Sequence, residues 1–152
     1  MDTITEYLND DHHRCDDLGA EAKICVGKEQ WDRASLSFER FSNALELHFT
    51  MEEDVLIDAF EKAIKSGDGP TCVMRNEHRV IRSIMFMLQD ALERRAKNAF
   101  LGHFDTLDIM IQQHNLVEES FLYPMIDRMF AAQKETIINA MNLISAPECG
   151  EL

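Results

Sequence analysis

The sequence has few glycines and prolines and no long apolar run. Six glycines and three prolines among 152 residues argue against a turn-rich β-protein and against a low-complexity chain. No apolar run approaches the ~20 residues that span a bilayer. The first residues are polar and acidic, whereas a signal peptide begins basic and continues apolar. We therefore expect a cytoplasmic protein that does not associate with membranes.

Positive charge and paired cysteines are also scarce. Fifteen basic and 28 acidic residues give a formal charge of −13, which argues against nucleic-acid binding because phosphate contacts need clustered lysine and arginine. The four cysteines form no C-x-x-C pair, so zinc-finger and thioredoxin-like motifs are unsupported. We expect Cys15, Cys25 and Cys72 to be free thiols that pack as small apolar residues.

Apolar residues recur at spacings of three and four, which is typical of amphipathic helices. The pattern predicts four long helices over 3–25, 32–65, 70–96 and 101–130, and a short fifth helix over 134–145. Breaks are expected after Gly27, at 66–70 and around 98–102, and Pro124 is expected to kink the fourth helix or end it early. Short connections favour an all-α, antiparallel up-down-up-down four-helix bundle. We expect residues 1–146 to form one domain and residues 147–152, with Cys149, to form a flexible tail.

Four histidines and two glutamates share the apolar stripes of these helices. Two of the histidines are followed by a glutamate four residues later, which places each pair on one helix face. Every member in the first half of the chain has a counterpart in the second half, always at the same separation in sequence. The chain is therefore interpreted as two similar helical hairpins around a pseudo-twofold axis, with these side chains meeting at the centre. The three corresponding pairs are His12 and His78, His48 and His114, and Glu52 and Glu118.

Buried carboxylates need a partner, because desolvation without one is costly. Arg79 and Arg82 flank His78 but lie off or at the edge of its stripe, so no buried cation balances the glutamates, whereas a bound metal would. Six ligands exceed one tetrahedral zinc site and suit two ions with bridging carboxylates. Carboxylate-bridged pairs in helical bundles are usually iron or manganese, and the nitrogen-rich donors shift our preference to iron over manganese or zinc.

The segments that carry these residues resemble a known family. They are DHHRCD at 11–16, HFTMEEDVL at 48–56, GPTCVMRNEH at 69–78 and QHNLVEESFLYP at 113–124. Together they resemble hemerythrin-like domains of the His-His-Glu cation-binding family. The resemblance implies that the six residues bind two iron ions, with the glutamates bridging alongside an oxo or hydroxo group. The set of four histidines and two glutamates is more similar to the iron-centre repair and stress-response branch of the family than to oxygen-carrying hemerythrins. The oxygen carriers have a fifth histidine one turn from the histidine of the third helix, and Met74 and Arg82 occupy the positions one turn either side of His78 here.

Three functions are compatible with such a centre. The first is a binding module for O2, NO or a related small oxidant, serving sensing, storage or delivery, and a sensor would require a protein partner. The second is an enzyme of oxidative or nitrosative stress, such as a peroxidase, an NO reductase, a ferroxidase or an iron-centre repair protein. The third is a protein whose metal chiefly stabilises the bundle.

Residues next to the six candidates are predicted less sharply. His13 is expected to be exposed, because it lies about 100° around the helix from His12. Glu53 and Glu119 are expected to point sideways, onto the solvated or the inter-helix face. The sequence does not decide whether Cys15, Asp16 and Tyr123 lie in the core or on the surface. Asp16 is a candidate hydrogen-bond partner of a metal-binding histidine. Asp16 or Tyr123 is also a candidate general acid for an enzyme. A water-excluding ring is predicted from Phe41, Phe49 and Phe121.

Overall fold

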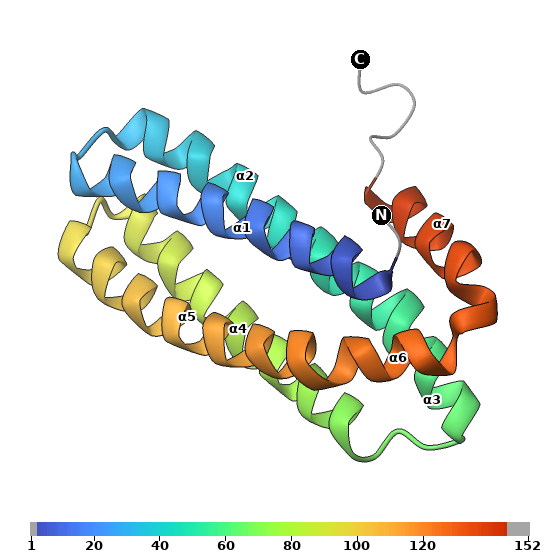
Figure 1. The fold of residues 1–152 in the computed structure, drawn as a ribbon. Coiled ribbons are helices and arrows are strands. Elements are labelled where there is room, and N and C mark those ends of the chain that lie inside the picture. The colour runs from blue at the N-terminus through green and yellow to red at the C-terminus, as the bar shows by residue number, and fades with distance from the viewer. Residues whose placement is uncertain (1–2, 146–152) are drawn as a thin grey trace.

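The computed structural model describes residues 3–145 and confirms the all-α prediction, with no strand among those residues. Two antiparallel hairpins pack on each other, as Figure 1 shows: α1 (Ile4–Gly27) with α2 (Trp31–Thr50), and α4 (Pro70–Glu93) with α5 (Lys97–Val117). Helix α1 also contacts α5, and α2 contacts α4. The sequence repeat pairs Ile4 with Pro70 and Gly27 with Glu93, and these are the first and last residues of α1 and α4. The repeat seen in the sequence is therefore also a repeat of structure.

The second helix of each hairpin continues beyond these bounds. Helix α2 runs through the π-helical segment η1 (Met51–Ile57) into α3 (Asp58–Ile64). Helix α5 runs through the π-helical segment η2 (Glu118–Leu122) into α6 (Tyr123–Met129). After the short 3-10 turn η3 (Ala131–Gln133), the fifth helix α7 (Lys134–Ser145) packs against α1, α2 and η1 and covers one end of the bundle (Figure 1).

The first hairpin turn follows Gly27 as predicted, whereas the second lies a few residues before its predicted position. Gly27 is the last residue of α1, and the chain reverses at Glu29, which has a left-handed φ of 55°. Arg95 has the same conformation, with φ 53°. In each turn the next residue donates a backbone hydrogen bond to the end of the preceding helix, as in a Schellman motif. Gln30 N–H donates to Cys25 O at 3.0 Å, and Ala96 N–H donates to Ala91 O at 2.8 Å. The predicted break at 98–102 is therefore wrong, since these residues belong to α5.

Pro124 neither ends its helix early nor accounts for the π-helical segment before it. Helix α6 continues past Pro124 to Met129. Pro124 is the second residue of α6, directly after the change from π-helical to α-helical hydrogen bonding. The corresponding residue of the first half, Asp58, also follows a π-helical segment, so this backbone feature belongs to the repeat and not to proline.

Two apolar clusters fill the bundle on either side of the candidate residues. One contains Phe38, Phe41 and Phe104, near the hairpin turns, and the other contains Leu8 and Leu56, near α7. Cys15 and Cys25 are buried as predicted, but Cys72 is exposed, because it lies on the outer face of α4 one position after the buried Thr71. No helix in residues 3–145 is long and apolar enough to cross a membrane. The predicted tail at 147–152 lies outside the described residues.

Candidate metal centre

The structure brings the six candidate side chains together at the middle of the bundle. Each of the four long helices contributes one histidine and each π-helical segment one glutamate, and all six side chains are buried. His78 Nε2 lies 3.2 Å from His114 Nε2, and His48 Nε2 lies 3.1 Å from Glu52 Oε1. The donor atoms fall into two groups, within each of which they lie at most 4.8 Å apart: Glu52, His78, His114 and Glu118, and then His12, His48 and Glu118.

Every one of the four imidazoles is held from behind by a carboxylate of a neighbouring helical segment. In each case Nδ1 lies within hydrogen-bonding distance of the acid, so that an Nδ1–H donates to it. The pairs are His12 with Glu119 at 2.8 Å, His48 with Asp11 at 2.7 Å, His78 with Glu53 at 2.6 Å, and His114 with Glu77. These pairs also obey the repeat, with Asp11 corresponding to Glu77 and Glu53 to Glu119.

The outer hydrogen bonds determine what the imidazoles present to the centre. A proton on Nδ1 leaves the lone pair of Nε2 facing inward, which is the form in which histidine binds a metal. Two such lone pairs would repel at the 3.2 Å between His78 and His114. In addition, His48 Nε2, Glu52 Oε1 and Glu118 Oε2 are buried and make no hydrogen bond of good geometry, although His48 Nε2 lies 3.1 Å from Glu52 Oε1 and Glu118 Oε2 lies 3.1 Å from His114 Nε2. Because buried polar atoms in proteins are rarely left unpaired, this donor set fits a bound cation.

The electrostatics of the cluster point the same way. Burial lowers the pKa of His48, but the carboxylates of Glu52 and Asp11 outweigh burial and raise it to about 10. Burial likewise lowers the pKa of His114, and Glu118 raises it to about 9. Burial raises the pKa of Glu52, yet the charge of His48 and hydrogen bonds from its neighbours hold it well below its usual value. The centre therefore attracts positive charge strongly.

Tyr123 also lies in the centre, a placement that the sequence left open. Its side chain is fully buried, and its hydroxyl donates to Glu52 Oε2 at 2.8 Å. The same hydroxyl lies 3.1 Å from Glu118 Oε1 and 3.2 Å from His12 Nε2. Burial, followed by the charges of Glu118 and Glu52, raises the pKa of Tyr123 well above its usual value. The phenol therefore remains protonated beside both glutamates.

The π-helical segment η2 affects which side chains are buried after His114. In α-helical spacing Val117 and Phe121 would follow His114 inward, but both are exposed, Phe121 by 59%. A π-turn contains an extra residue, so the buried positions become Glu118 and Leu122. The predicted water-excluding ring is therefore wrong for Phe121, whereas Phe41 and Phe49 are buried near the centre.

Glu53 and Glu119 lie on the inter-helix face, which is one of the two placements predicted for them, and they contact His78 and His12 on neighbouring helices. His13 is exposed on α1 as predicted. Asp16 is exposed as well. It was predicted as a possible hydrogen-bond partner of a metal-binding histidine, but the Nδ1 atoms of all four histidines contact other acids. Cys15 is buried, and burial raises the pKa of its thiol to about 12.

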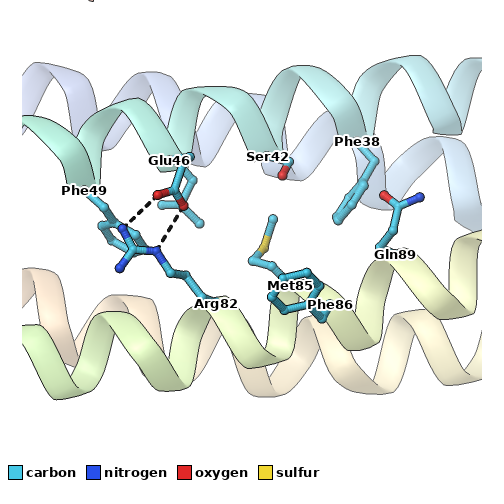
Figure 2. A pocket seen from close by; sticks show the side chains of 9 residues that line it. Phe38, Ser42, Glu46, Phe49, Arg82, Met85, Phe86 and Gln89 are labelled. Carbon is cyan, nitrogen blue, oxygen red and sulfur yellow. Dashed lines mark hydrogen bonds and ion pairs between the residues drawn. The ribbon is translucent and has the colours of Figure 1, made fainter. Parts of the chain in front are cut away.

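One face of the centre is closed by Phe49 and Arg82. The Phe49 ring stacks on His78, with centroids 4.0 Å apart, and the Arg82 guanidinium lies 5.2 Å from the Phe49 centroid. Arg82 also binds Glu53, at 2.9 Å, and Glu46 across the seam between α2 and α4. Figure 2 shows this Arg82–Glu46 pair at the end of a groove of about 490 Å³ between the two helices.

A helical bundle with imidazoles and carboxylates on its inner faces is the architecture of bundle metalloproteins. In a comparison with family models, the Hemerythrin HHE cation binding domain matches residues 3–133. The chain therefore belongs to the hemerythrin HHE cation-binding family, and its buried histidine–glutamate cluster is the candidate metal site. Searches of curated proteins and of solved structures returned no match.

Proposed function

We propose that this protein is a non-haem di-iron protein that binds O2, NO or a related small oxidant for sensing, storage or delivery. The observation that carries the proposal is the inward convergence of four Nε2 atoms, each fixed by a carboxylate on Nδ1, with three buried central atoms that make no hydrogen bond of good geometry. In this proposal one iron is bound by each donor group. Glu118 belongs to both groups, and together with Glu52 and an oxo or hydroxo bridge it would link the two ions.

The charge of the surroundings supports two cations over one. Six carboxylates contact the four imidazoles or belong to the cluster itself. Two guanidinium groups, Arg14 on Asp11 and Arg82 on Glu53, offset two of them. With neutral imidazoles at least four negative charges remain, because Arg82 also pairs with Glu46, and this excess favours two bound cations over one. The nitrogen-rich donor set without thiolate favours iron among the divalent metals.

Iron bound in this way supplies reversible binding of small gases and one-electron redox chemistry. The chain supplies orientation and protection. Asp11, Glu53, Glu77 and Glu119 fix the tautomer and the direction of the imidazoles, which raises their basicity as ligands. Phe49 stacks on His78, and Phe41 is buried nearby. These rings exclude bulk water from the centre and would slow its irreversible oxidation.

Tyr123 favours a second candidate function, an enzyme of oxidative or nitrosative stress. Its hydroxyl proton is held at Oη within 3.2 Å of three candidate ligand atoms. A buried phenol in this place can donate a proton to a reacting oxygen or nitrogen atom. Peroxidase, NO reductase, ferroxidase and iron-centre repair activities are the reactions compatible with this donor.

The experiment that tests both candidates is an oxygen titration of the anaerobic, iron-loaded protein with visible absorbance as the readout. A band that forms with O2 and disappears on degassing supports carriage or sensing. Bleaching with turnover of added peroxide or NO supports the enzyme. Absence of any spectral response in a protein that retains iron contradicts both and leaves a metal that only stabilises the bundle.

A further inference from the structure

A small cavity lies between α1 and α2, in the part of this hairpin that is near its turn (Figure 1). Its volume is about 130 Å³, which corresponds to about four molecules of liquid water. None of the six candidate metal ligands lines it, and the nearest of them on α2, His48, is roughly three helical turns away. The lining residues are Glu21 and Cys25 of α1 and Arg33, Leu36, Ser37 and Arg40 of α2.

The two arginines of this cavity have no partner in the protein. Arg33 and Arg40 stand two helical turns apart, which places both on the same face of α2. Within residues 3–145 neither guanidinium makes a hydrogen bond or an ion pair, whereas Arg14, Arg75 and Arg82 all bind carboxylates. In a chain of formal charge −13 acidic partners are plentiful, so two free guanidinium groups beside one cavity point to an external anion.

The hydroxyl group of Ser37 is a second, independent sign of a ligand. Ser37 stands one turn from each arginine, on the same face of α2. Its side chain is 4% exposed, and its Oγ is buried without a hydrogen-bond partner. A hydroxyl in a helix commonly donates to the carbonyl four residues earlier, as those of Thr50 and Ser83 do. Because buried polar atoms are rarely left unpaired, the Ser37 hydroxyl is a donor that lacks its acceptor.

The repeat does not account for these three residues of α2. All six candidate metal ligands have a counterpart of the same type in the other half of the chain. The second hairpin has neither arginine nor serine at the positions that correspond to the two arginines and the serine of the cavity. The residues there are Ala99, His103 and Thr106. Hairpin packing therefore does not require the arginine pair, and the cavity is a feature of the first hairpin alone.

The charge of the lining favours an anion. Two guanidinium groups face the single carboxylate of Glu21, which leaves the lining with a net positive charge. Asp32 and Glu39 adjoin the arginines in sequence, but each lies about 100° around the helix from its neighbour, and neither lines the cavity. The positive charge of the lining is therefore a local exception on an acidic protein.

The arrangement of donors favours phosphate over a carboxylate. A phosphate group has enough oxygen atoms to accept hydrogen bonds from both guanidinium groups and from a hydroxyl, and arginine is well suited to bind it in bidentate geometry. A carboxylate has only two oxygen atoms. The cavity has room for a phosphate group but not for a nucleotide, so the organic part of a phosphate ester would lie outside, next to Leu36, which is 51% exposed.

We propose that the cavity between α1 and α2 binds a phosphate group through Arg33 and Arg40, with a hydrogen bond donated by Ser37 Oγ. Inorganic phosphate and a small phosphate monoester share this chemistry. The site is separate from the metal centre, and the inference does not rest on the proposed iron.

The test is isothermal titration calorimetry of inorganic phosphate into the full-length protein, at constant ionic strength and with equal iron content in every variant. The wild type should bind one phosphate with a Kd of about 1 mM or tighter. Arg33→Gln and Arg40→Gln should each weaken binding about tenfold, because a charge-assisted hydrogen bond is lost. Arg128→Gln is the control, since Arg128 is exposed on α6 and lies outside the cavity, and its affinity should stay within about twofold of wild type.

Ser37→Ala separates the proposed role of the hydroxyl from a structural one. The variant should bind phosphate about fivefold more weakly. Its midpoint of thermal unfolding without phosphate should not fall, because the hydroxyl has no partner in the folded protein. A lower midpoint with unchanged phosphate affinity would contradict the role given to Ser37.

Phenyl phosphate distinguishes the two sources of the phosphate group. Tighter binding of the ester than of inorganic phosphate identifies a monoester as the ligand, and equal or weaker binding identifies free phosphate. A wild-type protein without saturable phosphate binding would overturn the inference, as would acetate bound as tightly as phosphate. Affinity unchanged in Arg33→Gln and Arg40→Gln would place the phosphate elsewhere, the metal centre included, and would overturn it too. A wild type that binds phosphate but no iron refutes the proposed function alone.

Discussion

Tyr123 donates a hydrogen bond to Glu52 Oε2 at 2.8 Å, although the two residues belong to opposite halves of the chain. The contact joins α6 to η1 at the centre of the bundle. The residue that corresponds to Tyr123 in the first half is Ile57, which is buried but has no polar group. The pseudo-twofold centre is therefore unequal at this point, with one phenol serving both glutamates.

Removing the hydroxyl group of Tyr123 should destabilise the metal-free protein. Tyr123→Phe leaves Glu52 Oε2 without its donor in a fully buried site, at a cost of about 2 kcal/mol in the free energy of unfolding. Tyr7→Phe is the matched control, because the Tyr7 hydroxyl donates to Asn142 at 2.7 Å in an exposed pair and its loss should cost about 1 kcal/mol or less. Urea unfolding monitored by circular dichroism measures both. Equal losses for the two variants would contradict the role given to Tyr123.

The carboxylates behind the imidazoles should control iron affinity without binding iron. Glu53→Gln and Glu119→Gln weaken the hydrogen bonds to His78 and His12, and each should lower iron affinity about 10- to 100-fold. The two positions are equivalent in the repeat, so both variants should lose affinity, although only Glu53 is also bound by Arg82. Asp54→Asn is the control, since Asp54 adjoins Glu53 in sequence but is exposed. Competition with a chelator gives the affinities, and an Asp54→Asn protein as weak as the others would refute this account.

The sequence was sufficient to predict the helices and the convergence of donors, because both follow from periodicity. The spacing of His48 and Glu52, and its recurrence in the second half of the chain, required only that the chain be helical. The fifth helix was predicted at the residues it occupies, Lys134–Ser145, because its apolar spacing is regular. Such features depend on local geometry, which a single sequence specifies well.

The acids behind the imidazoles were missed because they depend on packing between helices. Asp11 adjoins His12 in sequence, yet it bonds His48 on α2, a relationship set by how α1 and α2 face each other. Glu53 and Glu119 bond His78 and His12 on neighbouring helices, which depends on how the π-helical segments face α4 and α1. The echo of Asp11-His12 in Glu77-His78 was the signal that an outer set of acids also obeys the repeat.

Gly19 should be intolerant of a side chain. A Cβ there would lie 3.1 Å from Phe41 Cε1 and 3.2 Å from Phe104 Cζ, and both rings are buried in a packed aromatic cluster. Gly19→Ala should lower the free energy of unfolding by about 1–3 kcal/mol from overpacking. Gly102→Ala in α5 meets nothing within 4 Å and should raise it by about 0.5–1 kcal/mol through helix propensity. Thermal denaturation compares the two, and stabilisation by Gly19→Ala would be inconsistent with the packing described.

The cysteine thiols should differ sharply in reactivity. Cys72 is exposed, whereas Cys15 is buried beside the centre and burial raises the pKa of its thiol to about 12. Because the thiolate is the reactive form, Cys15 should stay unmodified near pH 8 while Cys72 reacts rapidly. Labelling with a maleimide in a Cys149→Ser background, followed by peptide mass spectrometry, identifies the modified residue. Rapid labelling of Cys15 in the folded protein would show that this side of the centre opens to solvent.

The most direct test of the account is the number of irons bound per chain after anaerobic reconstitution. Elemental analysis should give two irons for the wild type and for His13→Ala, which removes a histidine exposed beside His12. His48→Ala and Glu118→Ala should lose iron, and their thermal stability should fall toward that of the metal-free protein, because metal binding and folding are coupled. A wild-type protein that binds no iron, or His48→Ala and Glu118→Ala proteins that each retain two, would contradict the proposal that these buried side chains converge around metal ions.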